Sequence, residues 1–271
     1  MPDIDLYHER PDLYDLLHDG YVADLPFYAS LVDLLSPTGG DALELGCGSG
    51  RALAALRETG LDVTGLDSSP MMLERARARL ARFGGGVRLV QGDMRDLAAS
   101  DLGDERFDLI VVAINTFLHL EDHADQRACL EGVRARLAPG GAAVIDVLNP
   151  FHALTLPQGT LTLRRHLHDE ARAMEVSVTG VFEVDPTAPR MTDRLYFDEW
   201  TAGGPVSRST TRVDLRLLFM PELELLLAGA GLGIADAYGD YDLGPYHAAA
   251  ERMIVVLRAY EDAFAAYPPS L

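Results

Sequence analysis

The chain has 271 residues and a formal net charge of −19, with 48% hydrophobic and 24% charged residues. Its length allows one large domain or one domain with a sizeable insertion, and its hydrophobic content is ordinary for a globular protein. The strong negative charge argues against a partner with a phosphate backbone, so we expect no nucleic acid partner.

The first forty residues predict a helical lead-in to the main domain. Aromatic residues recur at intervals of seven, at Tyr7, Tyr14, Tyr21 and Tyr28. With leucines between them, these rings are typical of a stripe that packs onto a neighbouring surface. Residues 37–40, Pro-Thr-Gly-Gly, predict the turn into the first strand.

An apolar strand starts at Asp41 and runs into three glycines at alternate positions, followed at once by a helical pattern from Arg51. Glycines let the backbone turn sharply, and the free N–H groups of a helix start can receive polar ligand groups. This arrangement predicts the opening of a nucleotide-binding α/β sheet. A dinucleotide fingerprint that began at Gly46 would require a glycine where Arg51 stands.

An acidic residue stands at or just after the end of each of the next two predicted strands. The strand over 61–66 ends at Asp67, which can accept two hydrogen bonds from ribose hydroxyls. Asp67 also precedes a helix with Pro70 at its first position, where Ser69 can be the cap. The strand over 87–91 is followed by Gly92-Asp93-Met94.

A nearly continuous apolar run over 107–114 predicts a parallel strand that is buried on both faces. A helix follows, and residues 137–141 predict a turn into a fifth strand over 142–147. Strands that alternate with helices in this way predict a doubly wound parallel sheet, with ligands bound at the carboxyl edge of the strands.

Residues 155–219 break this rhythm, because apolar and polar residues alternate over several stretches. This pattern predicts an antiparallel sheet with one solvated face. The α/β pattern then returns, with a helix over 221–230 and strands over 232–238 and 252–257.

The motif Glu44-x-Gly46-x-Gly48-x-Gly50 resembles motif I of the class I S-adenosylmethionine-dependent methyltransferases. Gly92-Asp93-Met94 resembles their third motif, and Leu137-x-Pro-Gly-Gly141 is frequent in the same family. The resemblance implies an α/β fold: a doubly wound, Rossmann-like, seven-stranded sheet with an inserted antiparallel β-sheet lid. The lid makes the chain most similar to bacterial methyltransferases that act on amino sugars and other natural products.

The resemblance divides the chain into four parts. A helical N-terminal cap is expected over 1–40, a cofactor-binding core over 41–154, a substrate-side sheet over 155–219 and the completion of the core over 220–271. The implied cofactor is S-adenosylmethionine, and the expected acceptor is a small molecule. The residues expected to bind the cofactor are Tyr14, Glu44, Gly46, Cys47, Gly48, Asp67, Ser68, Met72, Asp93, Met94 and Ile114.

Methyl transfer to an amine needs only a neutral nucleophile, whereas a hydroxyl acceptor needs a general base. His119 is the candidate base, because it follows the fourth strand and its pKa suits proton removal near neutral pH. Asn115 is the candidate for orienting the methyl group or the acceptor. The alternatives are a structural histidine at the start of the next helix and a turn asparagine.

Tyr21, Tyr196 and Trp200 are the candidates for binding the acceptor. Tyr196 and Trp200 share one face of the inserted sheet, and the alternative is that Trp200 belongs to the core. The cluster of His119, Glu121, Asp122 and His123 resembles a set of metal ligands. Near-adjacent residues rarely converge on one ion, so we expect helix capping there and no metal.

Two other functions stay open: a protein that binds the cofactor without transferring methyl, and an NAD-linked oxidoreductase, which Arg51 and Asp93 disfavour. Cys47 and Cys129 lie far apart, so no disulfide framework is expected. No signal peptide is visible at the acidic N-terminus, and the longest apolar run is far too short to span a bilayer. We therefore expect a cytoplasmic monomer or homodimer without membrane contact.

Overall fold

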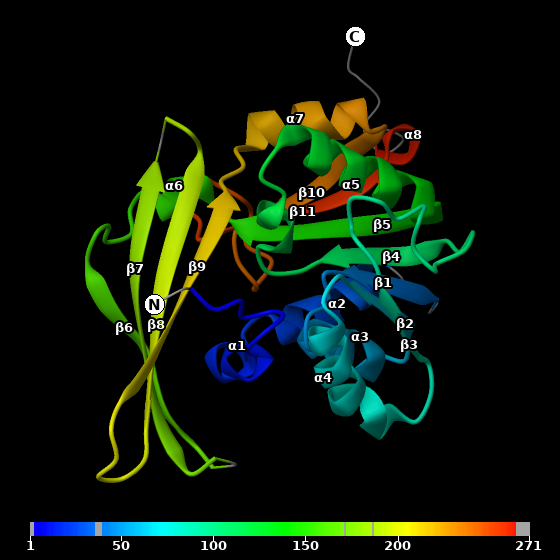
Figure 1. Ribbon diagram of the computed structural model, residues 1–271. Helices are drawn as coiled ribbons and strands as arrows, with labels where there is room; N and C mark the ends of the chain where they lie inside the picture. Colours follow the sequence, from blue (N-terminus) through cyan, green and yellow to red (C-terminus); the bar gives the residue numbers. More distant parts are fainter. Residues whose placement is uncertain (1–2, 36–39, 171, 186, 264–271) are drawn as a thin grey trace.

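The structure is a computed structural model that describes residues 3–35, 40–170, 172–185 and 187–263 (Figure 1). Most of the turn predicted over 37–40 lies outside the described residues.

A seven-stranded sheet forms the centre of the molecule, in the order β10-β11-β5-β4-β1-β2-β3. Strands β1 to β5 pair in parallel, and β11 is antiparallel to both β5 and β10. The doubly wound sheet predicted from the sequence is thereby confirmed. The strands are β1 (Asp41–Leu45), β2 (Asp62–Asp67), β3 (Val87–Gln91), β4 (Phe107–Val112), β5 (Leu137–Leu148), β10 (Leu232–Tyr238) and β11 (Arg252–Ala259).

Helices cover both faces of this sheet, with α5 and α7 on one side and α2, α3 and α4 on the other (Figure 1). Alternate residues of each central strand enter separate apolar cores, so Leu43 packs with α5 and α7 while Ala42 packs with α2 and α3. The helices of this part are α2 (Leu25–Leu35), α3 (Arg51–Glu58), α4 (Pro70–Leu80), α5 (His123–Arg136), α6 (Pro150–Ala153), α7 (Met220–Gly229) and α8 (Tyr260–Ala263), with 3₁₀ turns at Ala81–Phe83 and Thr116–His119.

A separate four-stranded antiparallel sheet, in the order β6-β7-β8-β9, stands beside the first (Figure 1). Its strands are β6 (Leu161–Asp169), β7 (Met174–Asp185), β8 (Arg190–Trp200) and β9 (Ser207–Arg216). We call this sheet the lid. Residues Ser207–Thr211 at the start of β9 are mostly polar, and they gain their strand structure from pairing with β8.

The N-terminal segment fills the space between the lid and α4. Residues Leu6 and Leu13, the latter in α1 (Pro11–His18), form a third apolar core with Val178, Leu195 and Phe197 of the lid. On the other side, Asp15 forms an ion pair with Arg75 of α4. The segment therefore contacts both parts of the molecule.

One predicted boundary is wrong, because β5 begins at Leu137, where the sequence predicted a turn over 137–141. The register of β5 against β4 shifts after Leu137, which pairs with Phe107, and resumes at Ala142, which pairs with Leu109. The intervening residues bulge outward, and Gly140 supplies the positive φ of +76° that the bulge needs.

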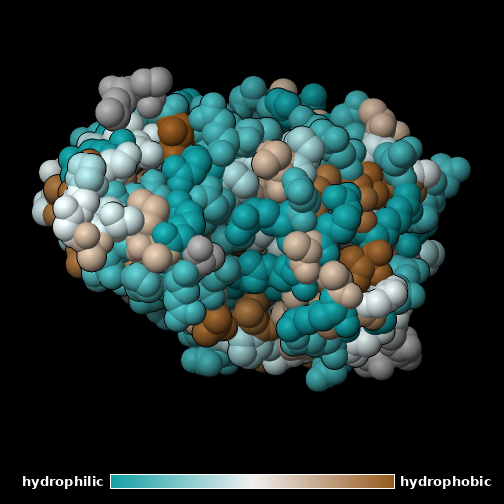
Figure 2. All heavy atoms as spheres, turned by 60° about the horizontal axis from the view of Figure 1, so that its bottom comes forward, coloured by the Kyte–Doolittle hydropathy of each residue, from teal (hydrophilic) through white to brown (hydrophobic). Residues whose placement is uncertain are grey.

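The surface is polar on the face that Figure 2 shows. Figure 2 shows one face covered largely by hydrophilic side chains, with apolar ones in small scattered groups. Among the described residues, no helix combines the length and apolar character that crossing a membrane requires.

Candidate functional site

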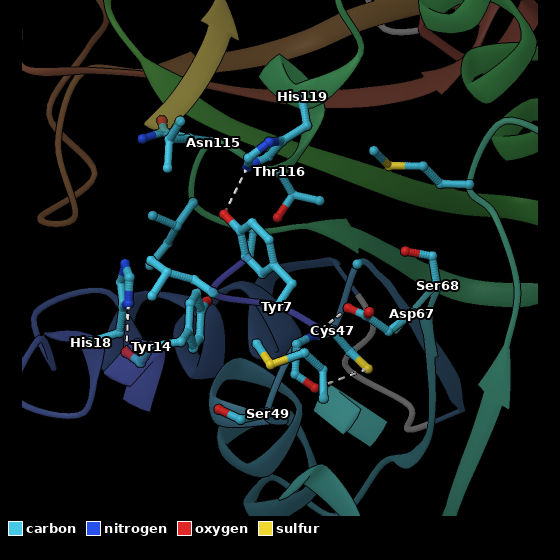
Figure 3. A pocket seen from close by; sticks show the side chains of 18 of the residues that line it. Tyr7, Tyr14, His18, Cys47, Ser49, Asp67, Ser68, Asn115, Thr116 and His119 are labelled. Carbon is cyan, nitrogen blue, oxygen red and sulfur yellow. Dashed lines mark hydrogen bonds between the residues drawn. The ribbon is translucent and has the colours of Figure 1, made fainter. Parts of the chain in front are cut away.

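A cavity of about 550 Å³ lies where the carboxyl ends of β1, β2, β3 and β4 face the lid and the N-terminal segment. Figure 3 shows side chains from these elements turned toward the same space. All eleven residues predicted to bind the cofactor line this cavity, as do Asn115 and His119. Residues that lie far apart in the sequence are thus brought together at the predicted edge of the sheet.

The glycine loop forms the floor of the cavity. Gly46 and Gly48 have φ angles of +64° and +54°, a region that favours glycine. A Cβ atom on Gly46 would lie 2.4 Å from Cγ2 of Thr116, so a side chain there would collide with the turn after β4. The loop therefore leaves bare peptide groups against which a ligand can lie.

Glu44, at the end of β1, is buried beneath this loop. Its Oε2 atom has no hydrogen-bond partner in the part of the chain that the structure describes. Burial raises the pKa of Glu44 from 4.5 to about 8, although the nearby Arg51 acts in the opposite direction. A buried carboxyl oxygen without a partner is costly, and a cationic ligand group would relieve that cost.

Asp67 lies beside the glycine loop at the end of β2. Its Oδ2 accepts a hydrogen bond from the Gly48 N–H at 2.8 Å, and its Oδ1 accepts one from the Ser69 N–H at 2.8 Å. Burial raises the pKa of Asp67, and these two N–H groups oppose the shift. As predicted, Ser69 caps α4 by accepting a hydrogen bond from the Met72 N–H.

Asp93, at the end of β3, is held by the side chain of Arg95. The Arg95 Nε donates to both Asp93 oxygens, at 3.0 and 2.9 Å, and this contact lowers the pKa of Asp93. Arg95 also donates to Asp125 at 3.1 Å. Asp93 is therefore an ionised acceptor at this end of the cavity.

Aromatic side chains of the N-terminal segment close the other side of the cavity. The Tyr14 ring stacks on His18 with centroids 4.2 Å apart and lies 5.6 Å from the Tyr7 ring. His18 bonds through Nδ1 to the backbone carbonyl of Tyr14, and burial lowers the pKa of His18. The sequence analysis selected Tyr14 but missed Tyr7 and His18.

Tyr7 and His119 form a contact that joins the N-terminal segment to the turn after β4 (Figure 3). The Tyr7 hydroxyl lies 3.3 Å from His119 Nε2, and Ser69 Oγ donates to the Tyr7 carbonyl at 2.7 Å. Burial lowers the pKa of His119 below 6.5 and raises that of Tyr7 above 10, so both are neutral near pH 7. The seven-residue spacing of the tyrosines was the available sequence signal for Tyr7.

Asn115 is held by its backbone surroundings. It adopts a left-handed conformation with φ +62°, and its side-chain Oδ1 accepts a hydrogen bond from the Leu148 N–H at 2.7 Å. Its own N–H donates to the Asp146 carbonyl at 2.9 Å. Asn115 therefore fixes the end of β4 against β5 at the wall of the cavity.

The structure does not bring the three predicted acceptor-binding residues to the cavity. Tyr196 and Trp200 lie on the face of β8 opposite Leu195 and Phe197, whose side chains are buried against the N-terminal segment. Tyr21 is 40% exposed and lies under the guanidinium of Arg51. The lid residues that line the cavity instead are Met191, Asp193, Leu195, Val213 and Leu215.

The acidic and histidine residues after β4 have separate roles. Asp122 caps α5 by accepting a hydrogen bond from the Asp125 N–H at 2.8 Å. Glu121 pairs with Arg190 of the lid, and His123 contacts Glu222 of α7. The described residues contain no group of three or more potential metal ligands.

The residues of the cavity fit the expected S-adenosylmethionine. The Glu44 Oε2 atom, which has no partner among the described residues, and the peptide groups at Gly46 and Gly48 suit a ligand with a cationic amino-acid end. Asp67 and Asp93 offer acceptors to hydroxyl and amino groups. Cys47, Ser68, Met72, Met94 and Ile114 complete a mixed apolar and polar wall between these ends.

Comparisons with known proteins agree with this geometry. Residues 42–141 match the family described as Methyltransferase domain. The chain is 28% identical to the cypemycin N-terminal methyltransferase of a Streptomyces species, over 95% of this chain and 99% of the relative. It is 34% identical to the dTDP-3-amino-3,6-dideoxy-alpha-D-glucopyranose N,N-dimethyltransferase of Streptomyces fradiae, over 54% of this chain and 55% of that one.

A solved structure extends the likeness to the whole fold. The CcbJ methyltransferase from Streptomyces caelestis superposes with a TM-score of 0.73 at 29% identity, covering 89% of this chain and 91% of its own. The match extends beyond the domain over 42–141, so most of the remainder of the fold is shared as well.

Proposed function

This chain is an S-adenosylmethionine-dependent methyltransferase, and we propose that it methylates the nitrogen of a small-molecule amine. The observation that carries the proposal is one continuous cavity, in which the glycine loop and its acidic neighbours meet the Tyr7–His119 pair beneath the lid. The two relatives named above carry names that specify an N-terminal methyltransferase and an N,N-dimethyltransferase. The charge of −19 also favours a small acceptor over a nucleic acid.

When bound, S-adenosylmethionine supplies an electrophilic methyl group on a sulfonium, which is transferred by in-line displacement. The residues of this chain hold the reactants in position and exclude water, which supplies most of the acceleration in such a reaction. Glu44, Gly46, Gly48, Asp67 and Asp93 are the proposed cofactor ligands. Asn115 is the proposed positioning residue, because it fixes the backbone next to the reacting groups.

The amine must lose its proton before or during the attack. His119 is the proposed acceptor of that proton, because its lowered pKa keeps the imidazole neutral and its Nε2 faces Tyr7 inside the cavity. The Tyr7 hydroxyl orients the imidazole through the same contact. A hydroxyl acceptor would need a stronger base than a neutral histidine without a carboxylate partner, which is why nitrogen is the favoured target.

Calorimetric titration with S-adenosylmethionine, S-adenosylhomocysteine and NAD tests the cofactor assignment. We expect micromolar binding of both sulfur nucleotides and none of NAD. The Asp67→Asn variant, which keeps the shape of the side chain beside Gly48, should lose at least about tenfold in affinity. Binding of NAD in preference to the sulfur nucleotides would overturn the proposal.

A mass-spectrometric screen of amines and alcohols with S-adenosylmethionine then tests the reaction. The proposal expects methylated amines and unmodified alcohols. Methyl transfer to oxygen alone would contradict it, and tight cofactor binding with no transfer to any acceptor would favour the non-catalytic alternative.

A further inference from the structure

The part of the cavity wall that the lid supplies is apolar except at one position. Strand β8 turns every second side chain inward, so Met191, Asp193 and Leu195 face the cavity in succession. Val213 and Leu215 of β9 continue the same wall. Asp193 is therefore a single carboxylate in the otherwise apolar wall that the lid supplies.

Asp193 is incompletely paired. Its Oδ1 accepts a hydrogen bond of 3.3 Å from Arg164 Nη2, and its Oδ2 has no hydrogen-bond partner among the described residues. The side chain is 27% exposed, and burial raises the pKa of its carboxyl group. A partly buried carboxylate with one long ion pair is costly, and a positively charged ligand group would offset the cost.

The other charged groups of the cavity also favour a cationic ligand over an anionic one. Five carboxyl groups and two arginines line it, and burial keeps one of the five, Glu44, mostly protonated near pH 7. Both arginines are already neutralised: Arg51 forms two hydrogen bonds with Asp24, at 2.8 and 2.7 Å, and Arg95 pairs with Asp93 and Asp125. No lysine occurs in the sequence. A phosphate group that entered the cavity would meet carboxylates and no free arginine among the described lining residues.

We propose that the methyl acceptor is a phosphate-free amine with a second, positively charged amino group that pairs with Asp193. The inference rests on the proposed function, since it assigns the acceptor of the same cavity. The proposed acceptor differs from that of the relative named for a dTDP-linked amino sugar, because the carboxylates of this cavity would repel a diphosphate. In this assignment Asp193 determines specificity and takes no part in the transfer of the methyl group.

Binding to the full-length protein saturated with S-adenosylhomocysteine tests the assignment. The probes are the diamine putrescine, the monoamine butylamine and dTDP, each titrated by calorimetry. We expect putrescine to bind at least about tenfold more tightly than butylamine, and dTDP not to bind. Asp193→Asn should abolish the preference for putrescine, whereas Arg164→Gln should strengthen it because it removes the competing cation.

Asp198→Asn is the matched control, because Asp198 lies on the same strand but pairs with Arg208 on the opposite face. It should behave as the wild type. Three results would each overturn the inference: no preference for putrescine in the wild type, a preference that survives Asp193→Asn, or binding of dTDP. The proposed function fails separately, at the earlier step, if S-adenosylhomocysteine does not bind at all.

Discussion

At the scale of single residues, the pair of Tyr7 and His119 links the chemistry of the site to the N-terminal segment. The two side chains come from positions 112 residues apart, and their contact is the point at which the segment meets the turn after β4. Because burial keeps the imidazole neutral, it can receive a proton without first losing one, and Tyr7 stays a neutral hydroxyl beside it.

Replacing His119 with Gln should lower kcat by about 100-fold, a typical value for the loss of a positioned base. Tyr7→Phe should lower kcat less, because the imidazole remains. Neither variant should change the Kd of S-adenosylhomocysteine more than about twofold, since neither side chain belongs to the proposed cofactor ligands.

The pH profile distinguishes a base from a structural histidine. In the wild type, kcat/KM should fall as the pH is lowered. The pKa of this acid limb should lie below 6.5, the ordinary value for histidine, because burial lowers the pKa of His119. The acid limb should disappear in His119→Gln. Tyr246→Phe, outside the cavity lining, is the control. A limb with a pKa below 6.5 that persists in His119→Gln would show that His119 is not the base.

Glu44 makes the ligand-free protein sensitive to pH. Its pKa of about 8 in the folded state exceeds the 4.5 of an exposed carboxyl group, so the folded state holds the proton more tightly. Stability should therefore fall as the pH rises from 4.5 to about 8, with Glu44 costing roughly 3 kcal/mol at pH 7. Urea unfolding across this range should show the slope in the wild type and a weaker one in Glu44→Gln, and identical slopes would contradict the prediction.

The sequence identified the strand-end residues that line the cavity, whereas the lid residues that line it were not among its candidates. Residues at strand ends, such as Asp67 and Asp93, were predictable because parallel strands carry their carboxyl ends to one edge. The position of Tyr196 and Trp200 outside the cavity was not predictable, because the alternation shows that β8 has two faces but does not show which face turns inward. That choice depends on packing of Leu195 and Phe197 against a segment almost two hundred residues away.

At the scale of elements, the glycine loop between β1 and α3 has little room for side chains. Gly46 has a positive φ and lies close to Thr116, so two independent features, the backbone conformation and the lack of space, both require glycine here. The sequence predicted the turn from the glycine spacing, but the contact with Thr116 depends on the turn after β4 and was not predictable from that spacing.

Gly46→Ala should destabilise the protein by roughly 1–3 kcal/mol and weaken binding of S-adenosylhomocysteine. Thr116→Ser removes the methyl group that the new Cβ would meet, so Gly46→Ala/Thr116→Ser should recover part of the lost stability. Gly85→Ala is the matched control, because nothing lies within 4 Å of its Cβ position. Thermal unfolding and calorimetry measure both effects, and additive losses in the double variant would show that the contact is not the cause.

At the scale of the whole molecule, the N-terminal segment connects the lid to the central sheet. On the lid side, Arg10 pairs with Glu199, and the Ile4 N–H donates to the Thr210 carbonyl at 2.7 Å. On the other side, Asp15 pairs with Arg75 of α4. The same segment carries Tyr7 and Tyr14, so the cavity is complete only when the lid, the segment and the sheet are together.

Leu13→Ala tests this connection, because Leu13 is fully buried in the core that the segment shares with the lid. Removing its side chain should cost about 2–5 kcal/mol of stability and should also weaken binding of S-adenosylhomocysteine, although Leu13 does not line the cavity. Leu225→Ala, at a position that is 77% exposed, should change neither. If Leu13→Ala lowered the unfolding temperature but left the affinity unchanged, the segment would hold its tyrosines in place without support from the lid. The lid would then contribute to the site only through its own residues, Asp193 among them.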